Sequence, residues 1–134
     1  MEDVKRILST LWIARMLASL QGDVVHFLQP GMLEEMIAGT TEIPITNEML
    51  LVMTIIMMVP IFMSFLSLVL KYKANRWANL SIGIFFIGFE IIFLILLFSS
   101  GSFPVAVDIL LNIVYLVFAA LVVWYAWKWP KQEG

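Results

Sequence analysis

Long apolar segments separated by shorter polar ones dominate the pattern of the chain. Four such segments cover residues 7–28, 49–70, 77–98 and 104–127. Each is about as long as a helix that crosses a hydrocarbon core of roughly 30 Å. Pro30 ends the first segment, because the residue before a proline avoids the helical conformation, and Pro104 suits the first turn of the last segment. The pattern predicts four transmembrane helices.

A shorter amphipathic pattern lies between the first two segments, at residues 31–38. Its apolar positions have helical spacing and its acidic positions lie opposite. These are Met32, Leu33, Met36 and Ile37 against Glu34 and Glu35. We expect a helix that lies flat on the lipid headgroups. The alternative is a lid over an outer pocket.

The composition supports a membrane environment. Hydrophobic residues make up 62% of the 134 residues and charged residues 13%, with a mean hydropathy of +0.98. Soluble domains average about 45–50% apolar and about 25% charged residues. The length allows a single domain, residues 1–134. A net charge of −2 without a basic block argues against a nucleic-acid partner, and the lack of cysteine excludes disulfides and thiolate ligands.

The basic residues predict a sidedness. Seven of the eight gather at one end of the predicted helices. They are Lys5, Arg6, Lys71, Lys73, Arg76, Lys128 and Lys131. Because cytoplasmic loops carry an excess of Lys and Arg, we expect an all-α, up-down-up-down bundle of four helices in the cell (cytoplasmic) membrane, with both termini cytoplasmic.

Several ionisable residues lie inside the predicted spans, where each costs a few kcal/mol. They are Arg15, Asp23, His26, Glu90 and Asp108, with Asn112 as a polar companion. We expect Arg15 and Glu90 to pair near the middle of the bundle. Above them, Asp23 and Asp108 could form a proton-binding pair or a cation site that opens outward. The alternatives are polar groups that only specify helix pairing, or a catalytic use.

Other chemistry is not indicated. His26 stands without partners at ligand spacing, so we interpret it as a solvated histidine and expect no metal. No motif points to a cofactor or to a catalytic residue. Pro60 lies in the middle of the second predicted helix and must kink it. It is a hinge candidate, although we favour an ordinary transmembrane proline whose freed backbone group finds a neighbouring partner.

A polar stretch precedes the third apolar segment. We interpret Arg76, between Asn75 and Asn79, as part of a short turn that holds two helix ends. Binding of lipid phosphates is the alternative use.

Several stretches together resemble an uncharacterised family of small four-helix prokaryotic membrane proteins, a domain of unknown function. They are residues 8–13 (LSTLWI), Asp23, residues 30–31 (PG), 70–79 (LKYKANRWAN) and 124–130 (WYAWKWP). The four-helix plan with an arginine in its first helix is more distantly similar to the DoxX-like group. These resemblances imply a fold and a membrane location. They assign no site to the second helix, where this chain has Met58 and Val59 before Pro60.

We therefore expect a non-enzymatic, multi-pass membrane protein that binds or transports a small amphipathic or cationic ligand at the buried polar residues. A structural or assembly subunit is one alternative. A lipid- or quinone-directed isomerase or redox partner, with Glu90 as its proton shuttle, is another. Membrane lipid is the expected partner. Small residues at four-residue spacing on the first helix also suit a homodimer.

Overall fold

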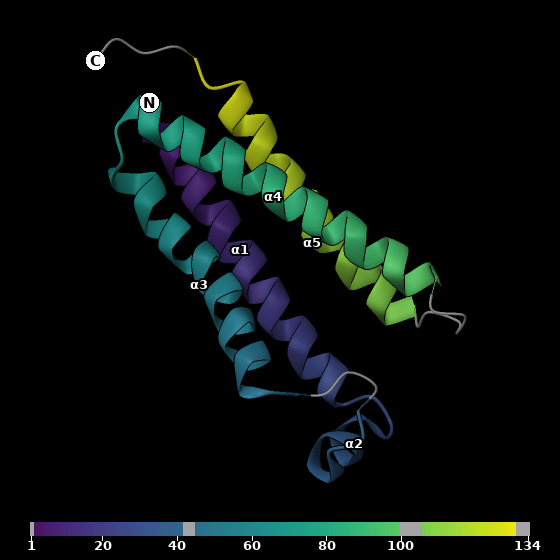
Figure 1. Ribbon diagram of the computed structural model, residues 1–134. Coiled ribbons are helices and arrows are strands. Elements are labelled where there is room, and N and C mark those ends of the chain that lie inside the picture. Colours follow the sequence, from purple (N-terminus) through teal and green to yellow (C-terminus); the bar gives the residue numbers. More distant parts are fainter. Residues whose placement is uncertain (1, 42–44, 100–105, 131–134) are drawn as a thin grey trace.

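The computed structural model describes residues 2–41, 45–99 and 106–130, and this part of the chain is all-α (Figure 1). Its helices are α1 (Glu2–Phe27), α2 (Met32–Ala38), α3 (Asn47–Val69), α4 (Tyr72–Ser99) and α5 (Ala106–Trp127). The predicted helix start at Pro104 and the last four residues lie outside the described part.

The predicted bundle of four transmembrane helices is wrong. In the described part, three of five helices are long and apolar enough to cross a membrane, namely α3, α4 and α5. α1 is not among them, because Arg15, Gln21 and Asp23 lower the hydropathy of every long window along it. The up-down-up-down plan assumed four spans, so it is wrong as well. The placement of both termini in the cytoplasm was derived from that four-span plan and is not supported without it.

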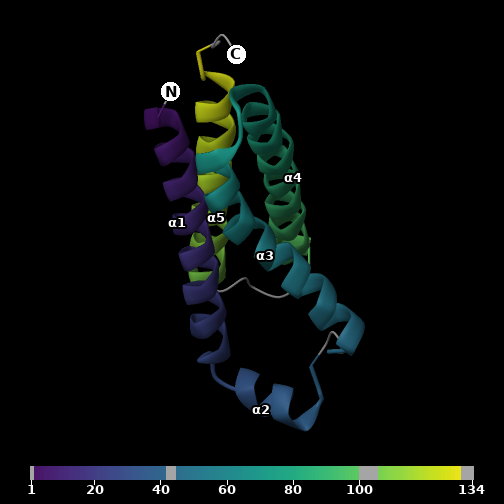
Figure 2. The ribbon, with the colours of Figure 1, turned by 90° about the vertical axis from the view of Figure 1, so that its left-hand side faces the viewer.

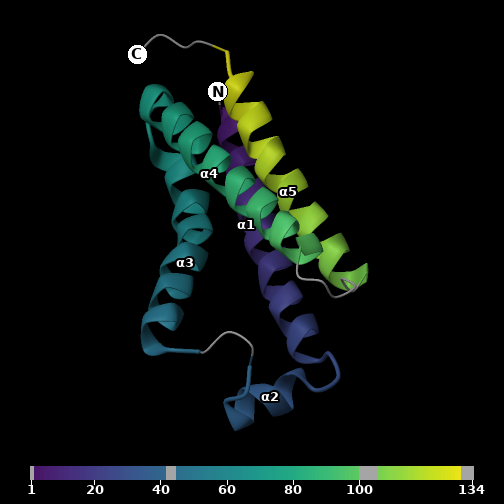
Figure 3. The same ribbon diagram turned by 45° about the vertical axis from the view of Figure 1, so that its right-hand side comes forward.

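The helices pack in the order α3, α1, α5, α4. α1 lies along both α3 and α5, and α4 lies along α5 (Figures 1 and 3). α3 and α4 are close at their connection and then diverge (Figure 3). The start of α1 and the end of α5 lie at the same end of the molecule, and α2 lies across the opposite end (Figure 2). The interior is bounded by α1, α3, α4 and α5, and α3 leaves it where it diverges from α4.

α4 begins at Tyr72, five residues earlier than the apolar pattern predicts, so only Leu70 and Lys71 connect it to α3. The last carbonyls of a helix have no partner within that helix. The side chain of Asn75 supplies one, donating from Nδ2 to the carbonyls of Ser67 at 2.7 Å and Leu70 at 3.3 Å. A polar side chain in the first turn of α4 thus makes the short connection stable.

Small residues allow α4 and α5 to approach closely. A Cβ atom built on Gly83 of α4 would lie 2.8 Å from Cγ2 of Val123 on α5. Ala119 and Val122 of α5 are fully buried at the same contact. Close approach over small residues is typical of helices that associate in lipid.

Candidate functional site

The most buried polar contact joins α1 to α4. Arg15 Nη2 donates a hydrogen bond to Glu90 Oε1 at 2.5 Å, and the two residues are 5% and 4% exposed. α1 and α4 are not among the helix pairs in extensive contact, so these long side chains bridge the interior diagonally. Buried charges are tolerated when they are paired. We call Arg15 and Glu90 the inner pair.

Aromatic rings surround the guanidinium of Arg15. Its Cζ atom lies 4.1 Å from the ring centroid of Phe86 and 5.9 Å from that of Tyr115. A cation near the face of an aromatic ring is attracted by the ring quadrupole. The inner pair is therefore held by packing as well as by charge. The Nε–H group of Arg15 is buried and has no acceptor among the described residues.

A second polar group lies nearer the end of the helices, where α1 ends and α5 begins. Asp108 Oδ1 accepts a hydrogen bond from Gln29 Nε2 at 3.2 Å and lies 3.8 Å from His26 Nδ1. The side chains of His26 and Asp108 are 42% and 22% exposed, so this group reaches the surface. Together with Asp23, which is half-buried one turn before His26, we call these residues the rim group.

Tyr115 on α5 lies between the inner pair and the rim group. Its hydroxyl donates to the carbonyl of Ala18 on α1 at 3.3 Å. It is also within electrostatic range of charged side chains from three helices. These are Arg15, Asp23, Glu90 and Asp108. Tyr115, which the sequence did not single out as a site residue, thus lies between the inner pair and the rim group.

The side chains of two predicted site residues do not contact the charged side chains of the inner pair or the rim group. Asn112 Nδ2 donates to the backbone carbonyl of Asp108 at 2.8 Å, within its own helix. Pro60 is buried inside an uninterrupted α3, and none of the contacts described above involves it. Its role as a hinge stays a prediction.

A third polar cluster, at the opposite end of the interior, was not predicted as a site. Trp12 Nε1 donates to Asn79 Oδ1 at 2.7 Å, and Asn79 Nδ2 donates to Asn75 Oδ1 at 2.7 Å. Ser67 Oγ donates to Asn79 Oδ1 at 3.3 Å. All four residues are fully buried, so this polar network ties α1, α3 and α4 together.

The signal for this network was the four-residue spacing of Asn75 and Asn79, which places them on one face of a helix. The apolar pattern placed the helix start at residue 77 and left Asn75 in a turn. These residues do hold helix ends, but from within α4. Arg76 does the same for α5, donating from Nε to the carbonyl of Ala126 at 3.0 Å.

The charges of the inner pair and the rim group do not balance. Arg15 offsets Glu90, which leaves the carboxylates of Asp23 and Asp108 and a net charge of −2 while His26 is neutral. In the described residues no group of three His, Asp or Glu side chains is arranged to hold a metal ion.

Comparisons with known proteins assign the chain to a family and give no activity. No curated protein and no solved structure shows significant similarity to it. The distant likeness to the DoxX-like group stays a prediction. One family model, described as "Family of unknown function (DUF6326)", matches residues 1–133. Because that match covers nearly the whole sequence, the chain belongs to this uncharacterised family.

Proposed function

We propose that this protein is a multi-pass protein of the cell membrane that binds a small amphipathic cation at the rim group. The observation that carries the proposal is the excess of carboxylate there. Asp108 lies near His26 and accepts a hydrogen bond from Gln29, Asp23 lies one turn before His26 on α1, and the buried Arg15 is already paired with Glu90. The same hypothesis extends to transport, in which the bound cation is also carried across the membrane.

The surroundings of the rim group favour a ligand that is apolar as well as charged. His26 is followed by Phe27, which is 43% exposed, and Asp108 is preceded by Val107, which is 38% exposed. Exposed apolar side chains are thus next in sequence to charged or polar ones, and such a mixture is typical of small-molecule binding. A strongly hydrated metal ion would gain little from the apolar side chains, whereas an organic cation can use both features.

The test uses tetraphenylphosphonium as the probe cation and the full chain in lipid nanodiscs. We expect calorimetric titration to show binding above that of empty nanodiscs, and Asp108→Asn to weaken it about fivefold. A partly exposed charge pair contributes up to about 1 kcal/mol, which corresponds to that factor. Uptake of the probe into liposomes that contain the protein tests the transport form.

Two controls sharpen the experiment. Tetraphenylborate has nearly the same shape and the opposite charge, so it should not bind above background. Glu48→Gln removes an exposed carboxylate from the first turn of α3 and should leave the affinity unchanged. Equal affinity of the wild type and Asp108→Asn for the cation would remove the proposal.

A second candidate function is a structural or assembly subunit, and the closure of the inner pair favours it. Arg15 and Glu90 are buried and satisfy each other's charge, which is what helix pairing alone requires. On this hypothesis the rim carboxylates can be neutralised without loss of function, while changes to Arg15 or Glu90 disrupt the protein.

The geometry does not support the third hypothesis, a lipid- or quinone-directed isomerase or redox partner. That function needs Glu90 to exchange protons with a substrate. Glu90 is 4% exposed, and its carboxylate accepts a hydrogen bond from Arg15. A carboxylate held in this way is not free to act as a proton shuttle.

A further inference from the structure

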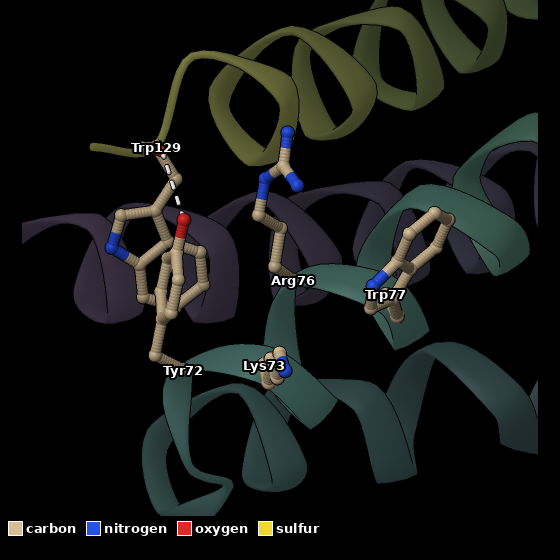
Figure 4. Close-up of a pocket in the computed structure, with 5 residues that line it drawn as sticks. All are labelled: Tyr72, Lys73, Arg76, Trp77 and Trp129. Carbon is tan, nitrogen blue, oxygen red and sulfur yellow. Dashed lines mark hydrogen bonds between the residues drawn. The ribbon is translucent and has the colours of Figure 1, made fainter. Parts of the chain in front are cut away.

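A pocket of about 350 Å³ lies at the end of the molecule opposite α2, where α4 begins and α5 ends (Figure 4). It is lined by Tyr72, Lys73, Arg76, Trp77 and Trp129. We propose that this basic pocket binds the phosphate of an anionic phospholipid headgroup. It is separate from the rim group, and nothing in the proposed function depends on it.

Two cations of α4 provide the charge. Lys73 and Arg76 are three residues apart, so they lie on neighbouring positions of one helix face. Arg76 donates from Nε to the carbonyl of Ala126 at 3.0 Å and from Nη2 to that of Trp127 at 3.4 Å. A guanidinium has five N–H donors, so others remain for an anion. In the described part of the chain, no carboxylate pairs with either cation.

Aromatic side chains form the walls on both sides of Arg76 (Figure 4). Tyr72 and Trp129 meet edge to face with ring centroids 5.3 Å apart, and the Tyr72 hydroxyl donates to the Trp129 carbonyl at 3.4 Å. Trp77 stands on the other side. The indole nitrogen of Trp129 points away from Arg76 in Figure 4, so Lys73 and Arg76 are the donors. The guanidinium is thus fixed between rigid apolar walls.

The position of the pocket favours a lipid over free phosphate. Two candidate spans, α3 and α5, end beside it at Val69 and Trp127. This places the pocket at the boundary where tryptophan and tyrosine meet lipid headgroups. Below Trp77, α4 presents Ile84 and Phe85, which are seven and eight residues on and exposed. They lie on the same side of the helix, where an acyl chain can follow the headgroup.

The test is native mass spectrometry of the full chain in detergent with added lipid. We expect phosphatidylglycerol to be retained more strongly than phosphatidylcholine of the same acyl chains. Lys73→Gln should weaken phosphatidylglycerol binding about fivefold, because it removes one of the two pocket cations from a charge pair with the phosphate. Lys73 is exposed and holds no helix end, so this change should not affect folding.

Lys128→Gln is the matched control. Lys128 lies at the same end of the molecule, outside the pocket, with Nζ 4.9 Å from the ring centroid of Trp124. It should change binding by less than about twofold. Equal losses in the two variants, or equal retention of the two lipids, would overturn the proposal. Displacement of the lipid by millimolar inorganic phosphate would show a site for the free anion and overturn it as well.

Discussion

Gly22 on α1 lies against the hydroxyl of Tyr115 on α5. A Cβ atom built on Gly22 would be 1.8 Å from Tyr115 Oη and 3.3 Å from Leu111 Cδ1. No larger residue fits without a shift of the ring. The missing side chain thus gives the tyrosine its place between the inner pair and the rim group, and it explains why this position of α1 is a glycine.

At this scale we predict that Gly22→Ala destabilises the protein by about 1–3 kcal/mol, the usual cost of overpacking. Thermal unfolding in detergent, followed by circular dichroism, measures the effect. Tyr115→Phe in the same chain should recover part of the loss, because it removes the atom that collides.

Gly88→Ala is the control, since nothing lies within 4 Å of a Cβ atom built on that helical glycine. Its stability should be equal to that of the wild type or higher, because alanine favours a helix more than glycine does. Equal unfolding temperatures for Gly22→Ala and Gly88→Ala would contradict the prediction.

At the scale of elements, one face of α4 carries the polar interior. Its buried residues recur at spacings of four, four, three and four, as on one stripe of a helix. They are Asn75, Asn79, Gly83, Phe86 and Glu90, and the sixth buried residue, Leu80, lies beside this stripe. Asn79 accepts a hydrogen bond from Trp12, and Glu90 accepts one from Arg15; both donors lie on α1. α4 thus holds two side chains of α1 by hydrogen bonds, although α1 packs along α3 and α5.

The inner pair allows a charge-exchange test of this role. Arg15→Glu and Glu90→Arg should each destabilise the protein by about 3–5 kcal/mol, because each leaves like charges buried together. The double variant should regain a large part of the loss. The yield of folded protein and its unfolding temperature measure this. Strict additivity of the two losses would show that the residues do not act as a pair.

Much of this arrangement follows from the sequence, and the exceptions have physical reasons. Arg15 and Glu90 could be matched because each is costly alone in an apolar helix. The start of α4 could not be predicted in this way. Tyr72, Lys73 and Asn75 interrupt the apolar pattern although the backbone is already helical there. Tyr115 was overlooked because its position depends on Gly22, on another helix.

For the whole molecule, α3, α4 and α5 are the candidate spans. Three successive crossings place the residue before α3 and the residue after α5 on opposite faces of the membrane. The predicted single domain and homodimer stay predictions. All three candidate spans expose many apolar side chains. Exposure therefore does not identify the surface that would contact a second copy.

The absence of native cysteine makes this topology measurable with single introduced thiols. Thr40→Cys and Lys128→Cys, both at exposed positions, should react with an impermeant maleimide from opposite sides of oriented vesicles. Lys71→Cys, between α3 and α4, should react from the same side as Lys128→Cys. Labelling of Thr40→Cys and Lys128→Cys from one side would contradict three crossings.

The separation of Arg15 and Glu90 along the chain matters for biosynthesis. The two residues are 75 positions apart, so the ribosome completes α1, α2 and α3 before the carboxylate exists. Until then the guanidinium must stay near water or headgroups, because a lone cation is costly in hydrocarbon. α1 can pack along α3 earlier, but its guanidinium gains a carboxylate partner only once α4 has been made.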